Sequence, residues 1–146
     1  DPNMSGRKLL LLRPQLVAFQ GELWLLGGRT AVGSTFAEVS IFDPASESWR
    51  PGPPMPVRRS GFAAAASATH LFVAGGGRLG ATPAVVNAAE AIAAGDAAWT
   101  PIPAPPVAVH GVGGAIHGNA FHLIGGSRVA ATAVNTGTVQ SYRFGP

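Results

Sequence analysis

The chain has 146 residues, a formal net charge of +3 and no cysteine. This length suits one ordinary domain, and the lack of cysteine excludes disulfides, thiolate zinc sites and cysteine nucleophiles. With 47% hydrophobic and 12% charged residues, the chain is expected to fold and not to remain disordered. Its 20 glycines and 13 prolines favour many short strands joined by turns.

The charge and hydropathy patterns narrow the range of partners. No apolar run approaches the roughly 20 residues of a membrane-spanning helix, and "KLLLL" (Lys8 to Leu12) is too short for a signal peptide core. All basic residues but one are arginine, and they form no run of the kind that binds nucleic acid. We therefore expect a soluble protein without a signal peptide, a membrane-spanning segment or a nucleic-acid partner. The composition does not favour any one cellular compartment.

The first predicted unit covers residues 11–56 and follows a tail at residues 1–10. A strand ends in the glycine pair of "LWLLGG", and a second strand, "EVSIF", covers Glu38 to Phe42. The turn "DPAS" precedes a further strand that opens at Trp49.

The second unit, residues 57–106, repeats this order. "GFAAAA" is a small apolar strand, "LFVAGG" ends in glycines, "EAIA" is the third strand, and Trp99 opens the fourth. The third unit, residues 107–146, contains "GVGGAI", "FHLIGG" and "TVQSYRF" but stops before any tryptophan. It is therefore expected to lack its outer strand.

The spacing shows that these units are repeats. The second glycine of each pair is Gly28, Gly76 and Gly126, at intervals of 48 and 50 residues, and Trp49 and Trp99 are 50 residues apart. A period of about 50 residues indicates a solenoid or a propeller. Small residues suit the crowded innermost strand of a propeller blade, and a tryptophan on the outer strand suits the wedge between blades. Both tryptophans are predicted to be mostly buried.

The strand-ending glycine pair, the "FDP" strand and the tryptophan six or seven residues later resemble the kelch repeat. "RRSGFAAAASATHLFVAGG" (Arg58 to Gly76) carries the resemblance most fully, whereas "AIAAGD" lacks the aromatic residue usual in the family. The resemblance implies an all-β fold, a β-propeller made of four-stranded kelch-like blades, with three blades in this chain. It says little about chemistry, because propellers include both binders and enzymes.

Other interpretations of the sequence are weaker. "GGGRLG" (Gly75 to Gly80), followed by Asp96, matches a dinucleotide fingerprint, and the alanine-rich segment between them has helical character, but the match occurs in one of three units. Copper radical chemistry, found in one branch of kelch-like propellers, needs a thiolate-modified tyrosine, and the chain has one tyrosine and no cysteine. His117 and His122 are five residues apart, but His122 aligns with aromatic positions of the other units. We therefore expect no cofactor and no bound metal.

Three blades do not close a ring, because closed propellers have roughly 4 to 8. A homodimer with six blades is the leading hypothesis, and a fragment of a longer propeller is the alternative. In the dimer, the N-terminal tail is a candidate outer strand for the third blade of the partner.

Strand direction predicts a basic face near the ring axis. The loops after the glycine pairs and the links into each inner strand open on one side, whereas Glu22, Asp43, Glu47 and Asp96 fall on the other. Glu38 and Glu90 are exceptions and are candidates for pairing with arginines. The candidate ligand-binding residues are Arg29, Arg58, Arg59, Arg78, His110 and Arg128. Guanidinium groups bind carboxylate or phosphate through paired hydrogen bonds.

Three classes of function remain open at this stage. The favoured class is a binding module for an anionic small molecule or an acidic peptide. The second is a sugar-modifying enzyme resembling the sialic-acid mutarotases, which are kelch-like rings. The third is a structural or designed half-propeller without a ligand.

Overall fold

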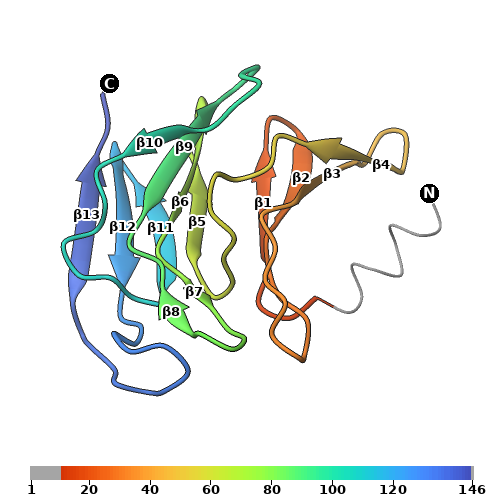
Figure 1. Cartoon of the computed structure of the whole chain (residues 1–146). Coiled ribbons are helices and arrows are strands. Elements are labelled where there is room, and N and C mark those ends of the chain that lie inside the picture. Colours follow the sequence, from red (N-terminus) through yellow and green to blue (C-terminus); the bar gives the residue numbers. More distant parts are fainter. Residues whose placement is uncertain (1–10, 146) are drawn as a thin grey trace.

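The computed structural model describes residues 11–145, which fold into β-strands joined by turns and loops. Figure 1 shows three antiparallel sheets side by side. The first sheet has the order β1-β2-β3-β4 and is formed by β1 (Gln15–Phe19), β2 (Glu22–Leu26), β3 (Val39–Asp43) and β4 (Ser48–Gly52). Within the described residues there is no helix that is long and apolar enough to cross a bilayer.

The second sheet has the order β10-β9-β6-β5. Its strands are β5 (Ala63–Ala66), β6 (His70–Ala74), β9 (Ala89–Ala93) and β10 (Thr100–Ile102). A separate hairpin pairs β7 (Gly77–Arg78) with β8 (Ala84–Val85) inside the loop that follows the glycine pair. The alanine-rich segment therefore contains strands and no helix, which contradicts the helical interpretation and removes the context of a dinucleotide site.

The third sheet has three strands among the described residues. They are β11 (Gly113–His117), β12 (Ala120–Ile124) and β13 (Val139–Arg143), in the order β11-β12-β13. The expectation that residues 1–10 act as a tail or as an outer strand for a partner lies outside the described residues.

Two hydrophobic clusters hold the sheets together. The first lies between the first and second sheets and contains Trp24, Leu26, Ile41, Phe62 and Leu71. The second lies between the second and third sheets, where the rings of Phe72 and Phe121 stack with centroids 5.6 Å apart. Each sheet therefore buries a face against the next sheet, as blades of a propeller do.

Small residues let the inner strands approach one another. β5 lies between β1 and β11, and a Cβ added at Gly114 of β11 would lie 2.7 Å from the Cβ of Ala63. A larger side chain at Gly114 would force the second and third sheets apart, which explains the Ala- and Gly-rich inner strands.

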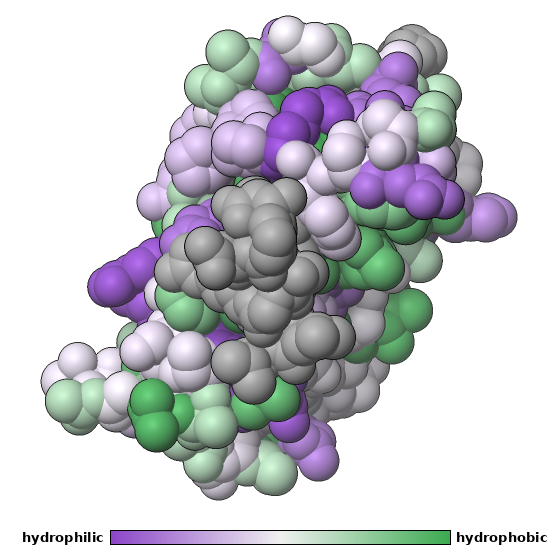
Figure 2. All heavy atoms as spheres, turned by 90° about the vertical axis from the view of Figure 1, so that its right-hand side faces the viewer, coloured by the Kyte–Doolittle hydropathy of each residue, from purple (hydrophilic) through white to green (hydrophobic). Residues whose placement is uncertain are grey.

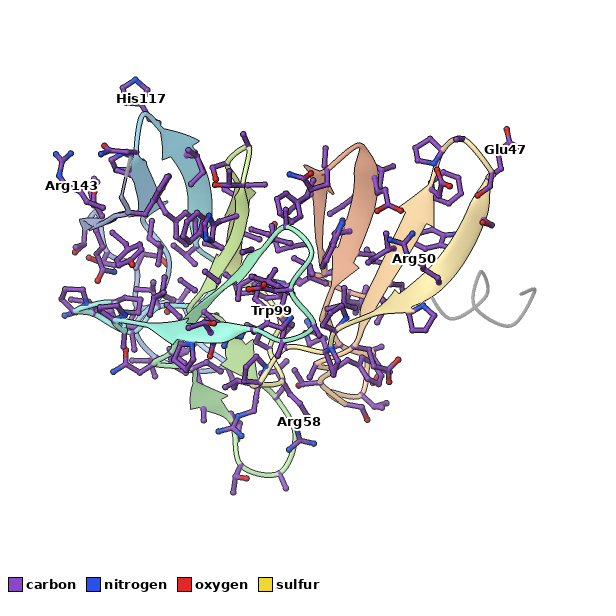
Figure 3. The ribbon with its side chains drawn as sticks, turned by 90° about the horizontal axis from the view of Figure 1, so that it is seen from above. Glu47, Arg50, Arg58, Trp99, His117 and Arg143 are labelled. Atoms are coloured by element: carbon purple, nitrogen blue, oxygen red, sulfur yellow. The ribbon has the colours of Figure 1, made fainter. Side chains whose placement is uncertain are left out.

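The two tryptophans that open the outer strands differ in environment. Trp99 is 7% exposed and its indole Nε1 donates a hydrogen bond to the carbonyl oxygen of Pro53 in the first unit. Trp49 is half-buried and contacts Phe42, with the ring centroids 5.1 Å apart. Both tryptophans are therefore mostly buried, as predicted, but Trp49 less deeply, because within the described residues only Trp99 has a preceding sheet to pack against. Figure 3 shows Trp99 near the centre of the molecule.

Candidate functional site

The start of each inner strand pairs with the residue that follows a glycine pair. Isolated antiparallel bridges join Leu12 to Arg29, Ser60 to Gly77 and His110 to Ser127. These positions recur at intervals of 48 and 50 residues, like the glycine pairs themselves. The three units therefore place equivalent backbone segments around one end of the inner strands.

The glycine pairs are structural. All six of their residues have positive φ, and Gly28 N–H and Gly76 N–H donate to the carbonyl oxygens of Arg59 and Val109, each in the next unit. A Cβ at Gly75 would lie 2.6 Å from the carbonyl oxygen of Val109, and a Cβ at Gly76 would lie 2.7 Å from the Cβ of Phe62. Glycine is required here because Val109 of the next unit passes too close to Gly75, and Phe62 of the same unit passes too close to Gly76, for a side chain.

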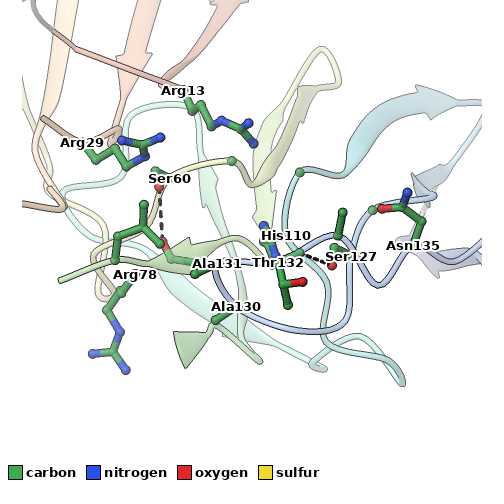
Figure 4. A pocket seen from close by; sticks show the side chains of 16 residues that line it. Arg13, Arg29, Ser60, Arg78, His110, Ser127, Ala130, Ala131, Thr132 and Asn135 are labelled. Carbon is green, nitrogen blue, oxygen red and sulfur yellow. Dashed lines mark hydrogen bonds between the residues drawn. The ribbon is translucent and has the colours of Figure 1, made fainter. Parts of the chain in front are cut away.

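A pocket of about 610 Å³ lies where these segments meet (Figure 4). Its basic side chains are Arg13, Arg29, Arg78 and His110, and its lining contains no Asp or Glu among the described residues. The His110 Nε2 lies 2.6 Å from the carbonyl oxygen of Val129, which fixes the ring against the third loop. The pocket is therefore a basic cavity near the inner strands, a setting in which anions are concentrated.

The structure places three of the six predicted site residues on this pocket: Arg29, Arg78 and His110. Arg58 lies outside it and lines a smaller pocket of about 250 Å³ together with Arg78 and the loop around Val32. Arg128 lines neither pocket. The predicted ring of equivalent arginines is therefore incomplete.

The ring of arginines is incomplete because the arginines of the second and third units are offset by one residue along the chain. Arg29 follows its glycine pair directly, whereas Gly77 and Ser127 hold that position in the other units, and Arg78 and Arg128 come one residue later. Successive side chains of an extended segment point in opposite directions. In Figure 4, the Arg78 side chain accordingly extends away from Arg29.

The prediction that Arg59 binds a ligand is wrong, because its side chain is fully buried and does not face the pocket. Its Nη2 donates to the Glu90 carboxylate at 2.5 Å, and its Nη1 donates to the carbonyl oxygens of Ala88 and Gly75 at 3.3 and 3.4 Å. Burial raises the pKa of Glu90, and the Arg59 guanidinium acts against this rise. Arg59 lies in the segment that links the first two sheets, and its ion pair with Glu90 attaches this segment to β9. This confirms Glu90 as a partner for an arginine, which the sequence analysis proposed as a candidate.

Sequence reasoning missed Arg13. It aligns with Gly61 and Gly111 at the repeat spacing of 48 and 50 residues, and like them it has positive φ. An arginine at a repeat position that otherwise holds glycine was the signal available in the sequence.

The acidic residues and the other histidines lie elsewhere. Asp96 lines a separate groove with His70 and Tyr142, and Glu22 pairs with Arg50 on the first sheet. His122 Nδ1 lies 2.7 Å from Ser141 Oγ. In the described part of the chain, no group of three or more His, Asp or Glu residues is arranged to hold a metal ion.

The fold places the chain among all-β repeat proteins, because its described residues form two four-stranded antiparallel sheets and a related three-stranded one. A family model for the kelch motif matches residues 13–56, which contain β1 to β4. Beta-scruin from Limulus polyphemus is 34% identical over 61 residues, or 42% of this chain and 7% of beta-scruin. Residues 13–56 therefore match a kelch motif, as the sequence resemblance predicts for the first unit. It spans a small part of that relative's length.

Proposed function

We propose that this chain is a propeller-type binding module that holds an anionic ligand in the basic pocket near its inner strands. The kelch repeat indicates a binding module in general terms. The observation that supports an anionic ligand is the lining itself, which combines Arg13, Arg29, Arg78 and His110 without a described carboxylate. An acidic sugar or the side chains of an acidic peptide match this chemistry.

The test is isothermal titration calorimetry at low and high salt, with glucuronic acid and a hexaglutamate peptide as probes. We expect binding at low salt that weakens as salt rises, and a loss of at least about tenfold in Arg29→Ala. Arg143→Ala is the matched control, because Arg143 is exposed, does not line the pocket, and lies at the outer edge of the molecule in Figure 3. Equal losses in both variants, or no binding of either probe, would contradict the proposal.

We further propose that a second copy of the chain closes the ring. Ile124 and Val139 of the third sheet are 55% and 60% exposed, whereas their equivalents in the second sheet, Ala74 and Ala89, are 1% and 5% exposed. At these positions the first sheet has Leu26 at 0% and Val39 at 3%. The face of the third sheet therefore has the hydrophobic pattern of a blade that receives another blade.

The first sheet offers the opposite face. Leu23 and Leu25 of β2 are half-buried, whereas the equivalent Leu71 and Val73 of β6 are completely buried against the preceding sheet. Figure 2 shows hydrophobic patches on this side of the molecule. The first sheet of one copy is thus the complement of the third sheet of another, since the same two kinds of face meet twice inside the chain.

Light scattering during size-exclusion chromatography tests the second copy. The proposal predicts a mass of twice 14.8 kDa, and a shift towards the monomer when Ile124→Asp is introduced. Val32→Asp is the control, because Val32 is 88% exposed on a loop. A well-folded monomer at all concentrations would contradict a six-bladed dimer, and further blades in a longer chain would then be the alternative.

A further inference from the structure

Arg13 occupies a backbone position that the other two units give to glycine. Its φ is +51°, and the equivalent Gly61 and Gly111 have φ of +59° and +61°. The three residues are joined in series, because Gly61 N–H donates to the Arg13 carbonyl oxygen and Gly111 N–H donates to the Gly61 carbonyl oxygen. The left-handed conformation is disfavoured for a residue with a Cβ. Glycine would therefore meet the needs of the fold at position 13, and the arginine side chain needs another explanation.

The side chain of Arg13 lies next to the two glycines. A Cβ added at Gly61 would lie 3.7 Å from Arg13 Cδ, and a Cβ added at Gly111 would lie 3.6 Å from Arg13 Nη1. Arg13 therefore extends from the first sheet past the second inner strand towards the third. Figure 4 shows its guanidinium group at the pocket, on the same side as Arg29.

Arg13 and Arg29 bring two positive charges to one side of the pocket. The bridge between Leu12 and Arg29 places their chain segments next to each other, with backbone hydrogen bonds of 2.8 and 2.9 Å. In the described residues, ion pairs with carboxylates are formed by Arg50 and Arg59 and not by these two arginines. The corresponding positions of the second and third units hold Gly61, Gly77, Gly111 and Ser127, which carry no charge.

We infer that Arg13 is a ligand-binding residue that works with Arg29 to hold one oxyanion, a carboxylate or a phosphate group, over the glycines of the inner strands. This inference rests on the proposed function. The unfavourable backbone conformation at residue 13 is retained because the side chain binds the ligand, a pattern known for strained residues at functional sites. The proposed oxyanion site is therefore asymmetric, because its two guanidinium groups come from the first unit and the equivalent positions of the other two units hold glycine or serine.

Arg13→Gly separates the structural from the functional role of the residue. Because glycine already occupies both equivalent positions, this variant is expected to fold, with a Tm equal to that of the wild type or up to about 3 °C higher. Its affinity for citrate or inorganic phosphate, measured by calorimetry at low salt, is expected to fall at least about tenfold. Arg13→Ala keeps the Cβ and should lose affinity without the gain in Tm.

The outcomes distinguish this inference from the proposed function. Wild-type affinity in Arg13→Gly, together with a loss in Arg29→Ala, would overturn the inference and leave the anion-binding pocket in place. A loss of the same size in Arg143→Ala would overturn it too, because the effect would then follow net charge and not position. If the wild type binds neither citrate nor phosphate, the inference fails, whereas the proposed function fails only if glucuronic acid and the hexaglutamate peptide do not bind either. A loss of affinity in Arg13→Gly for citrate, for phosphate or for both would support the inference about Arg13.

Discussion

The buried pair of Arg59 and Glu90 can be tested by a substitution that the chain itself suggests. The equivalent positions of the third unit hold Val109 and Gln140, which are 0% and 7% exposed. Gln140 accepts a hydrogen bond from Val107 N–H at 2.7 Å and donates one to the Val107 carbonyl oxygen at 2.9 Å. An uncharged pair therefore performs the same structural task one blade later.

Arg59→Val alone should destabilise the protein strongly. It leaves the Glu90 carboxylate, which is 3% exposed, without its positive partner. Breaking a buried ion pair in this way costs about 3–5 kcal/mol, and for a chain of this size Tm should fall by about 10–15 °C. The double variant Arg59→Val/Glu90→Gln should recover to within about 1 kcal/mol of the wild type, because the third unit folds with the same two residues.

The pH dependence gives the single variant a second signature. Burial raises the pKa of Glu90 above its usual value of 4.5, and Arg59 is the influence that lowers it. Without Arg59 the pKa rises further. A raised carboxyl pKa contributes stability that is present below pH 4.5 and is lost as the pH rises through the folded-state value. Arg59→Val should therefore be least destabilised in acid, and the double variant should lack this dependence.

Thermal unfolding followed by circular dichroism, at one protein concentration and at several pH values, measures both effects. A single variant within about 1 kcal/mol of the wild type at neutral pH would refute the argument from the unpaired charge. A double variant as unstable as the single one would assign the loss to the volume of the arginine side chain.

Three further predictions concern residues elsewhere in the fold. Trp99→Ala should cost about 3–5 kcal/mol, as for other buried large rings, and an unchanged chemical denaturation midpoint would contradict its position between the sheets. Gly76→Ala should cost about 2–4 kcal/mol, because it combines positive φ with a clash, whereas Gly118→Ala, with open space around it, should cost about 1 kcal/mol in the same denaturation assay. A hydrogen bond from Arg50 lowers the pKa of Glu22, so a small stabilisation present above pH 4.5 should disappear as the pH falls through the lowered value. Arg50→Gln should remove that dependence in a pH series of melting curves.

The fold was predictable because its signals repeat. Three strands ending in glycine pairs, at intervals of 48 and 50 residues, define the units without any tertiary information. The hairpin of β7 and β8 was not predictable, since two-residue strands in a loop have no periodicity to read.

The candidate site was predictable only in part. The face that carries the basic pocket follows from strand direction, and Arg29, Arg78 and His110 line that pocket. The sequence placed Arg78 and Arg128 as equivalents of Arg29, but a shift of one residue in an extended segment reverses the direction of a side chain. Arg59 has its partner 31 residues away in β9, a contact that the repeat pattern alone does not specify.

The exposed face of the third sheet has a consequence for assembly beyond ring closure. A contact between two unlike faces has no internal limit on the number of subunits, because every added copy presents a new free face. The angle between successive blades alone decides whether growth stops as a small closed particle or continues as a helical polymer. Under the proposed pairing of copies, substitutions at Ile124 or Val139 that tilt this contact would change the length distribution of the assemblies as well as their affinity.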